Sequence, residues 1–222
     1  MAKFSSISRR ELSSLLIAWV VLGISFSLAY LFNGVSAIDF ALIFPLTLVL
    51  VGTGFLGHEL AHKFTAEKYG CWAEFKLWTY GAVMALLFAL VSRGTFVFAA
   101  PGAVYIASRA GYFGEGLDRK SNGIVSVMGP LVNVVAASIF FAALVGVRSL
   151  GFPDLSVGGS GFRFLTAGVS LNLWLSAFNM LPIFILDGQK VFAWDKKIWA
   201  VIAIPLWVAA ITSPAILASL FH

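Results

Sequence analysis

The stretch FALIFPLTLVLVGTGFLGHELAHKFT, residues 40–65, places ionisable side chains inside a long apolar run. The run is long enough to cross a hydrocarbon core, which takes roughly 20 helical residues at about 1.5 Å each. An ionisable group near the centre of a bilayer costs at least ~2.5–3.5 kcal/mol on insertion scales. His58, Glu59 and His62 therefore need a reason to lie in this segment.

These three residues form the pattern His-Glu-x-x-His. Positions i and i+4 of a helix differ by about 40° in direction and about 6 Å in rise, so His58 and His62 can point imidazole nitrogens at one metal ion. Zinc accepts histidine nitrogen and keeps a position for water in catalytic sites. Glu59 can take the proton of that water. The pattern predicts a zinc hydrolase site, and a chance pattern of polar residues is the alternative.

The composition indicates that most of the surface faces lipid. Of the 222 residues, 60% are hydrophobic and 11% are charged, and the mean hydropathy is +0.94, far above that of an ordinary soluble domain. Five strong apolar segments are candidate transmembrane helices: 12–32, 40–65, 124–147, 164–186 and 198–221. We expect an all-α polytopic membrane protein with one domain over residues 1–222 and a motif-bearing core at about 40–190.

A weaker apolar stretch, residues 77–107, is split by Ser92-Arg93-Gly94. Its second half, TFVFAAPGAVYIA (95–107), is rich in β-branched and aromatic residues and contains Pro101-Gly102, which argues against a regular helix. Irregular backbone at membrane depth must pack on protein or line a water-filled cavity. We predict a helical hairpin or a helix followed by a re-entrant strand. The polar stretches 109–122, 149–161 and 188–197 are predicted to be loops.

Charge and cysteine content exclude two classes of protein. The formal charge of +5 comes from Lys and Arg residues at the ends of apolar segments, without an aromatic-interleaved basic stripe, so we expect no nucleic-acid partner. Cys71 is the single cysteine, so an intramolecular disulfide is impossible and a disulfide-stapled secreted domain is excluded.

Two histidines leave a zinc ion short of one protein ligand. Asp187 is the acidic residue besides Glu59 that directly abuts a long apolar segment far from its start. Pro182 disrupts the helix before it and frees backbone groups that can face a cavity. Gly188 permits a tight turn that would aim the carboxylate. From these residues Asp187 is either the third ligand or the solvated end of a helix.

Three motifs together resemble the site-2 protease family of intramembrane zinc metalloproteases, in its compact prokaryotic form without PDZ or CBS modules. They are H-E-x-x-H at 58–62, G-P-x-x-N at 129–133 and N-x-x-P-x-x-x-x-D-G at 179–188. They follow the order found in that family and cover about residues 40–190. The resemblance implies one site built from spans that are far apart in the sequence.

The resemblance also assigns roles. It implies that His58, His62 and Asp187 bind Zn²⁺ and that Glu59 is the general base. It further implies that Asn133 and Asn179 hydrogen-bond the substrate backbone or the developing oxyanion. For each asparagine, an interhelical hydrogen bond is the alternative.

The activity implied by the resemblance is hydrolysis of a peptide bond in or near a transmembrane helix of a substrate protein. A membrane metal transporter or channel could use the same His/Asp site, but such proteins often have internal repeats and paired broken helices, and this sequence has one broken helix and no repeat. A catalytically silent metal-binding relative is a further alternative, against which the intact Glu59 argues.

The distribution of basic residues predicts the orientation. If His62 and Asp187 bind one ion, their spans end on the same side of the membrane, and residues 73–121 must start and finish on that side. With the N-terminus inside, that side is cytoplasmic, and three of the fifteen Lys and Arg residues, Arg93, Arg148 and Arg163, fall outside. The other twelve are Lys3, Arg9, Arg10, Lys63, Lys68, Lys76, Arg109, Arg119, Lys120, Lys190, Lys196 and Lys197. We expect a multi-pass protein of the cytoplasmic membrane with its N-terminus and active site toward the cytoplasm and its C-terminus outside.

Overall fold

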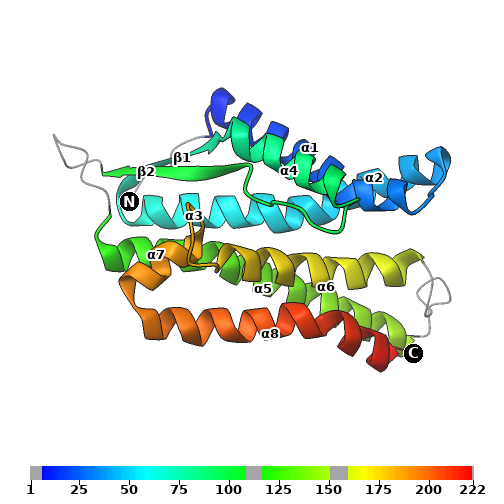
Figure 1. The fold of residues 1–222 in the computed structure, drawn as a ribbon. Coiled ribbons are helices and arrows are strands. Elements are labelled where there is room, and N and C mark those ends of the chain that lie inside the picture. The colour runs from blue at the N-terminus through cyan, green and yellow to red at the C-terminus, as the bar shows by residue number, and fades with distance from the viewer. Residues whose placement is uncertain (1–6, 109–116, 151–159, 222) are drawn as a thin grey trace.

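The computed structural model describes residues 7–108, 117–150 and 160–221, which are mostly helical with a small two-stranded sheet (Figure 1). In chain order the elements are α1 (Arg9–Phe32), α2 (Ala37–Val51), the π-helical turn η1 (Gly52–Leu56), α3 (Gly57–Lys68), β1 (Cys71–Leu77), α4 (Thr79–Val91), β2 (Gly102–Ser108), α5 (Arg119–Leu150), α6 (Ser160–Asn179), α7 (Asp187–Trp194) and α8 (Lys196–Phe221).

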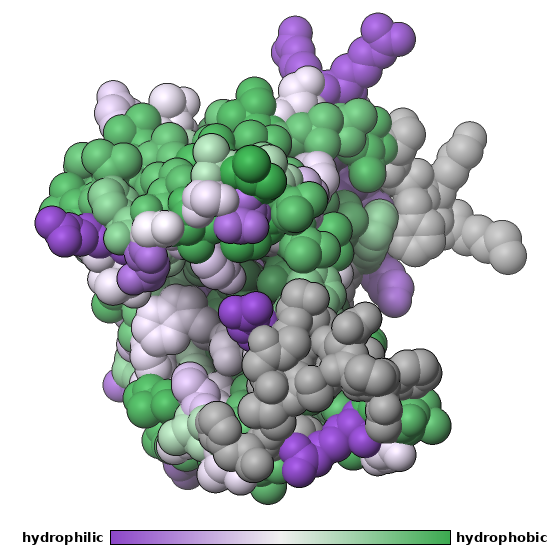
Figure 2. Space-filling model, turned by 90° about the vertical axis from the view of Figure 1, so that its right-hand side faces the viewer, coloured by the Kyte–Doolittle hydropathy of each residue, from purple (hydrophilic) through white to green (hydrophobic). Residues whose placement is uncertain are grey.

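Four helical stretches of the described chain are long and apolar enough to cross a membrane. They are Arg9–Phe32, Ala37–Lys68, Arg119–Leu150 and Lys196–Leu220, the second of which runs through α2, η1 and α3. They confirm the helices predicted at 12–32, 40–65, 124–147 and 198–221. Seen from the right of Figure 1, hydrophobic side chains gather over the upper half of the molecule, where α1, α2 and α4 lie (Figure 2). The chain is therefore a membrane protein.

The prediction of one helix throughout 164–186 is wrong. Helix α6 ends at Asn179, a run of turns follows, and α7 begins at Asp187. Pro182 has no N–H to continue the helix, and Phe184 adopts a positive φ of 52° that a right-handed helix cannot contain. The loop predicted at 188–197 is also wrong, because most of it belongs to α7 and the start of α8. Four of the five predicted spans are thus supported as helices both long and apolar enough to cross a membrane, and α6 covers only part of the fifth.

Residues 77–107 form helix α4 and then strand β2, so the helical-hairpin alternative is wrong. β2 pairs antiparallel with β1, with Cys71 opposite Ser108 and Leu77 opposite Gly102. Strand β1 was not predicted, and its presence means that the chain is not all-α. Pro101 directly precedes β2 and does not interrupt the strand. Whether this segment re-enters a membrane stays a prediction.

The packing places the sheet and α7 around one end of a helical bundle. Helix α5 packs against α3, α6 and α7, while β1 packs against α1 and α3. The end of α3 and the starts of α5 and α8 lie at the left of Figure 1, and the chain returns to this end through β2 before α5 begins. This arrangement brings α3, α5, α7 and β2 together around one site.

Candidate metal centre

Helix α3 carries both predicted histidine ligands on one face. His58 and His62 are one turn apart, their ring centroids are 4.7 Å apart, and both side chains are buried. The helix follows directly from the π-helical turn η1. Single π-helical turns inside α-helices occur often at functional sites. Both imidazoles therefore lie where α3 contacts α5.

Asp187 joins the histidines from the start of α7. Its Oδ2 lies 3.0 Å from Nε2 of His58 and 2.9 Å from Nε2 of His62. The donor atoms of the three residues lie within 4.8 Å of one another, and all three side chains are buried. Asp187 is 5% exposed, so it is not a solvated helix end. The structure brings the three predicted ligands together into a group that can hold a metal ion.

The surroundings of this group fit zinc. Two imidazole nitrogens and one carboxylate oxygen form a donor set that catalytic zinc sites use, with a position left for water. Gly129, on α5, faces the same point, because a Cβ at this position would clash with Nε2 of both His58 and His62. The absence of a side chain at Gly129 therefore leaves the space that an ion needs beside the two nitrogens.

The nitrogen of each imidazole that faces away from Asp187 has a partner on α5. Nδ1 of His62 lies 2.8 Å from the carbonyl oxygen of Val125, to which it can donate. Such a bond leaves Nε2 with its lone pair directed at the ion, as is usual for histidine ligands. Pro130, which lies inside α5, has no N–H to donate to the carbonyl of Ser126, the residue after Val125. The site thus includes a backbone carbonyl that sequence reasoning missed.

Asn133 lies behind His58 and has no exposed surface. Its side-chain amide is 3.3 Å from Nδ1 of His58. When its nitrogen is turned toward the neighbouring carbonyls, it donates to Gly129 at 3.1 Å and to Gly54 at 3.2 Å. The amide therefore connects α5 to η1 next to a ligand, which is the interhelical position considered for it.

Asn179, the last residue of α6, lies beside the cavity. Its Nδ2 donates to the carbonyl oxygen of Leu175 on its own helix at 2.9 Å. The cavity has a volume of about 30 Å³, which is room for one or two water molecules. Glu59 and the three metal-binding residues line it, together with β2 residues, Ile185, Leu186 and Lys190. A water in this cavity would lie beside both Glu59 and the His58/His62/Asp187 group, because all four residues line it.

Gly188 is required for a different reason from the one expected. A Cβ at this position would clash with the backbone carbonyls of Met180 and Leu181. Met180 is fully buried, and its carbonyl also accepts a hydrogen bond of 2.8 Å from Nε1 of Trp199. Gly188 therefore allows α7 to pack closely on the end of α6, and this contact fixes where Asp187 points.

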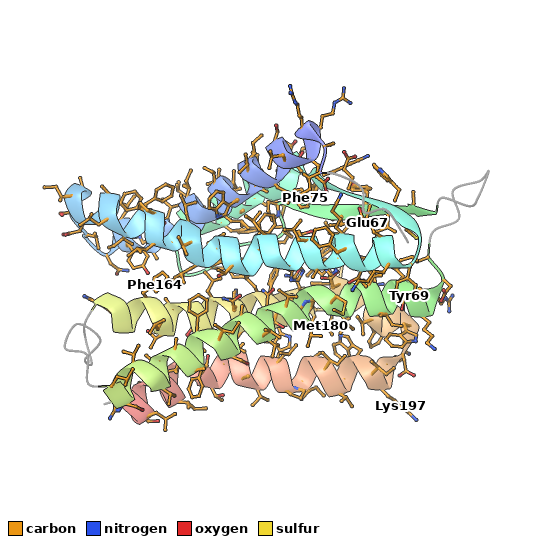
Figure 3. All side chains as sticks on the ribbon, turned by 180° about the vertical axis from the view of Figure 1, so that it is seen from behind. Glu67, Tyr69, Phe75, Phe164, Met180 and Lys197 are labelled. Atoms are coloured by element: carbon orange, nitrogen blue, oxygen red, sulfur yellow. The ribbon has the colours of Figure 1, made fainter. Side chains whose placement is uncertain are left out.

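A second buried ionic group, which we call the Lys63 cluster (Glu11, Lys63 and Glu67), was missed by sequence reasoning. Nζ of Lys63 lies 2.8 Å from Oε2 of Glu11 and 3.6 Å from Oε1 of Glu67. Lys63 also donates to the carbonyl of Ala73 at 2.8 Å, and the N–H of Phe75 donates to Glu11 at 3.1 Å. Glu67 lies on the side of α3 that faces the sheet, and Phe75 lies on the sheet itself (Figure 3). The cluster ties α1, α3 and β1 together.

Comparisons with known proteins find two relatives named as zinc metalloproteases. The chain is 38% identical over 199 residues to "Putative zinc metalloprotease MJ0611" of Methanocaldococcus jannaschii. The aligned region covers 90% of this chain and 92% of the relative. It is 30% identical over 161 residues to "Putative zinc metalloprotease YwhC" of Bacillus subtilis, covering 67% of this chain and 68% of the relative. No protein-family model matches the chain. No solved structure matches it either.

Proposed function

The chain belongs to a family of zinc metalloproteases, and from this premise we propose that it is an intramembrane endopeptidase of the site-2 protease type. One observation carries the proposal. A buried His58/His62/Asp187 group that can bind zinc shares a small cavity with Glu59, and both histidines and Glu59 lie on a helix apolar enough to span a membrane. The substrate is a peptide bond in or near a transmembrane helix of another protein.

The chemistry follows from the residues around the cavity. His58, His62 and Asp187 would hold zinc, and the ion would supply a Lewis acid next to the scissile carbonyl group and the attacking water. Glu59 takes a proton from the attacking water as the water oxygen bonds to the carbonyl carbon. Glu59 then delivers that proton to the amide nitrogen as the C–N bond breaks. The products are a new carboxyl end and a new amino end, between which the atoms of one water are divided.

The sheet offers the substrate an edge beside this site. The N–H of Trp78 donates to the carbonyl of Pro101 at 2.8 Å. Because bonded and non-bonded pairs alternate in an antiparallel ladder, Gly102, Val104 and Ile106 direct their backbone groups away from β1. These three residues line the cavity. An extended substrate segment can add there as a further strand.

The other edge of the sheet is closed. Lys63 donates a hydrogen bond to the carbonyl of Ala73, and Glu11 accepts one from the N–H of Phe75. Both backbone groups lie on the edge of β1 away from β2. The cavity itself is too small for a peptide segment. A substrate helix must therefore unwind locally, because its carbonyls are engaged in i→i−4 bonds, and the residues that line the cavity must move apart to admit it.

We further propose that the end of the bundle near the metal centre faces the cytoplasm. The end of α3 and the starts of α5 and α8 carry basic residues and lie at that end, whereas α4 and α5 run to the opposite end, beside Arg93 and Arg148 (Figure 1). Lys3 and Arg109, also assigned to the cytoplasmic side, lie outside the described residues. A cysteine placed at Ser219 should react with a membrane-impermeant reagent from outside the cell, and labelling from the cytoplasm would contradict this orientation.

The activity is tested with Glu59→Gln. The purified variant should keep stoichiometric zinc, measured by mass spectrometry of the metal, and lose cleavage of a single-span protein co-reconstituted in vesicles, whose cut site is mapped by peptide mass spectrometry. Glu74→Gln is the matched control, because Glu74 lies on the sheet and bonds to Ser8 outside the cavity. Equal cleavage by Glu59→Gln would exclude the protease mechanism, and zinc flux into liposomes would favour a transporter.

A further inference from the structure

The proposed reaction needs a hydrogen-bond donor for the oxygen of the scissile carbonyl, on which negative charge develops. Among the described residues around the cavity, His58, His62 and Asp187 are engaged with the metal position and Glu59 serves as the base. Asn133 lies behind His58, and Asn179 donates to its own helix. Asn133 is therefore turned to other partners, and Asn179 has one of its two amide N–H groups engaged within its own helix.

We propose that Lys190 is a further catalytic residue, whose ammonium group donates to the scissile carbonyl oxygen as it becomes anionic. This assignment rests on the proposed protease function. Lys190 lines the cavity, and its side chain is 34% exposed, so its charged end lies between the metal centre and the solvent. A substrate carbonyl bound in the cavity would therefore lie near Lys190.

The geometry leaves Lys190 free to act. Its Nζ lies 3.3 Å from Oδ1 of Asp187, the oxygen that is not shared by the two histidines. An ammonium group has three N–H donors, and this contact uses one of them. The i, i+3 spacing on α7 keeps Lys190 beside Asp187 on one face of the helix. The other two N–H donors of Lys190 can turn toward the cavity while the carboxylate of Asp187 holds the ammonium group in place.

Ser126 is another polar side chain of the cavity that can donate. It is 1% exposed and lies on α5. Hydrogen bonds from a charged donor to an anionic oxygen are roughly twice as strong as neutral ones. Removal of one donor to a developing oxyanion costs about 10²–10³-fold in kcat in enzymes where it has been measured. We therefore assign the main contribution to Lys190 and a small one to Ser126.

The test compares Lys190→Met with Lys190→Arg, Ser126→Ala and Lys197→Met. Lys197 is the matched control, since it is an exposed lysine that does not line the cavity (Figure 3). Turnover is followed with β-casein in detergent and then with a fluorogenic peptide made from a mapped casein cut. Lys190→Met should lower kcat about 10²–10³-fold with little change in KM. Lys190→Arg should recover most of the rate, and Lys197→Met should leave it unchanged.

Inhibitor binding separates catalysis from a structural role. A phosphinic peptide carries a tetrahedral anionic centre like the transition state, whereas a thiol peptide binds the metal without one. Lys190→Met should weaken the phosphinic peptide by at least tenfold, leave the thiol peptide unchanged and keep stoichiometric zinc. Equal weakening of both inhibitors with loss of zinc would show that Lys190 only positions Asp187 and would overturn the assignment.

Two further results separate this assignment from the proposed function. If wild-type protein cleaves the peptide and Lys190→Met cleaves it equally well, the assignment of Lys190 fails and the protease function stands. If zinc-loaded wild-type protein cleaves neither casein nor a single-span protein, the proposed function fails and the role of Lys190 fails with it.

Discussion

Two buried ionic groups lie side by side on α3, and they are built on opposite principles. In the Lys63 cluster, the ammonium group meets Glu11, Glu67 and the carbonyl of Ala73, so the buried positive charge is paired within the protein. In the metal centre, two imidazole nitrogens and a carboxylate oxygen converge on one point, which Gly129 keeps clear. The first group holds elements together, and the second has the form of a site that needs an ion.

The largest effect is expected from a substitution of Asp187, the metal ligand that is far from the two histidines in the sequence. Asp187→Ala removes the carboxylate that joins α7 to both histidines. We expect zinc to fall below one ion per ten molecules after gel filtration, and cleavage to fall at least ~10³-fold, because the Lewis acid supplies several kcal/mol of transition-state stabilisation. Asp195→Asn is the control, since Asp195 lies at the start of α8 and bonds only neighbouring backbone there. Full zinc in Asp187→Ala would remove this residue from the ligand set.

The next largest effect is expected from a substitution that breaks the Lys63 cluster. Lys63→Met leaves Glu11 buried without its cation, which typically costs about 3–5 kcal/mol of stability. We expect the free energy of unfolding, measured by denaturant titration in mixed micelles, to fall by about that amount. The folded fraction should still bind zinc stoichiometrically, because no metal-binding atom contacts Lys63 among the described contacts.

The double variant Glu11→Leu/Lys63→Met sharpens this result. Replacing both members of a buried ion pair by apolar residues is often close to neutral, so the double variant should be more stable than Lys63→Met alone. Lys68→Met, at the exposed end of α3, should change stability by less than ~0.5 kcal/mol. A loss of zinc from folded Lys63→Met would show that the two groups are coupled.

A third change fills the open space of the metal centre. Gly129→Ala places a methyl group against Nε2 of both histidines, and overpacking of this kind costs up to about 3 kcal/mol, which is roughly 100-fold in zinc affinity. Competition with a fluorescent chelator would measure the affinity. Gly146→Ala on the same helix is the matched control, because a Cβ there meets nothing within 4 Å. Unchanged zinc affinity in Gly129→Ala would place the ion elsewhere.

The metal centre was largely predictable from sequence, whereas the Lys63 cluster was not. The spacing of His58 and His62 follows from the period of one helix, and the motif set added Asp187. By contrast, Glu11 and Lys63 are 52 residues apart and carry no motif. Ser8-x-x-Glu11 predicts only a helix start, and Ser8 does accept a hydrogen bond from the N–H of Glu11. The pairing of two charges from different elements depends on how those elements pack.

The elements of the fold also divide into those that local sequence predicts and those that depend on packing. Long apolar segments predicted five spanning helices, of which four are supported, because length and hydropathy are local properties. Strand β1 was missed, although Cys71, Ala73 and Phe75 alternate with more exposed residues as strand positions do. The seven-residue segment is too short to signal a strand without its partner β2. The role of Lys190 was hidden for a similar reason, because a lysine after a helix start ordinarily reads as a solvated residue.

The smallest effect concerns Asn133, for which sequence left two roles open. If it positions His58, Asn133→Ala should weaken zinc binding about tenfold, at the lower end of the range for residues that support metal ligands, and should leave KM unchanged. If it binds substrate, zinc affinity should be unchanged and KM or kcat should be altered. Because its amide contacts His58, Gly129 and Gly54 and is fully buried, we expect the first outcome. Asn179→Ala, whose amide bonds within α6 beside the cavity, is the comparison that should leave zinc affinity intact.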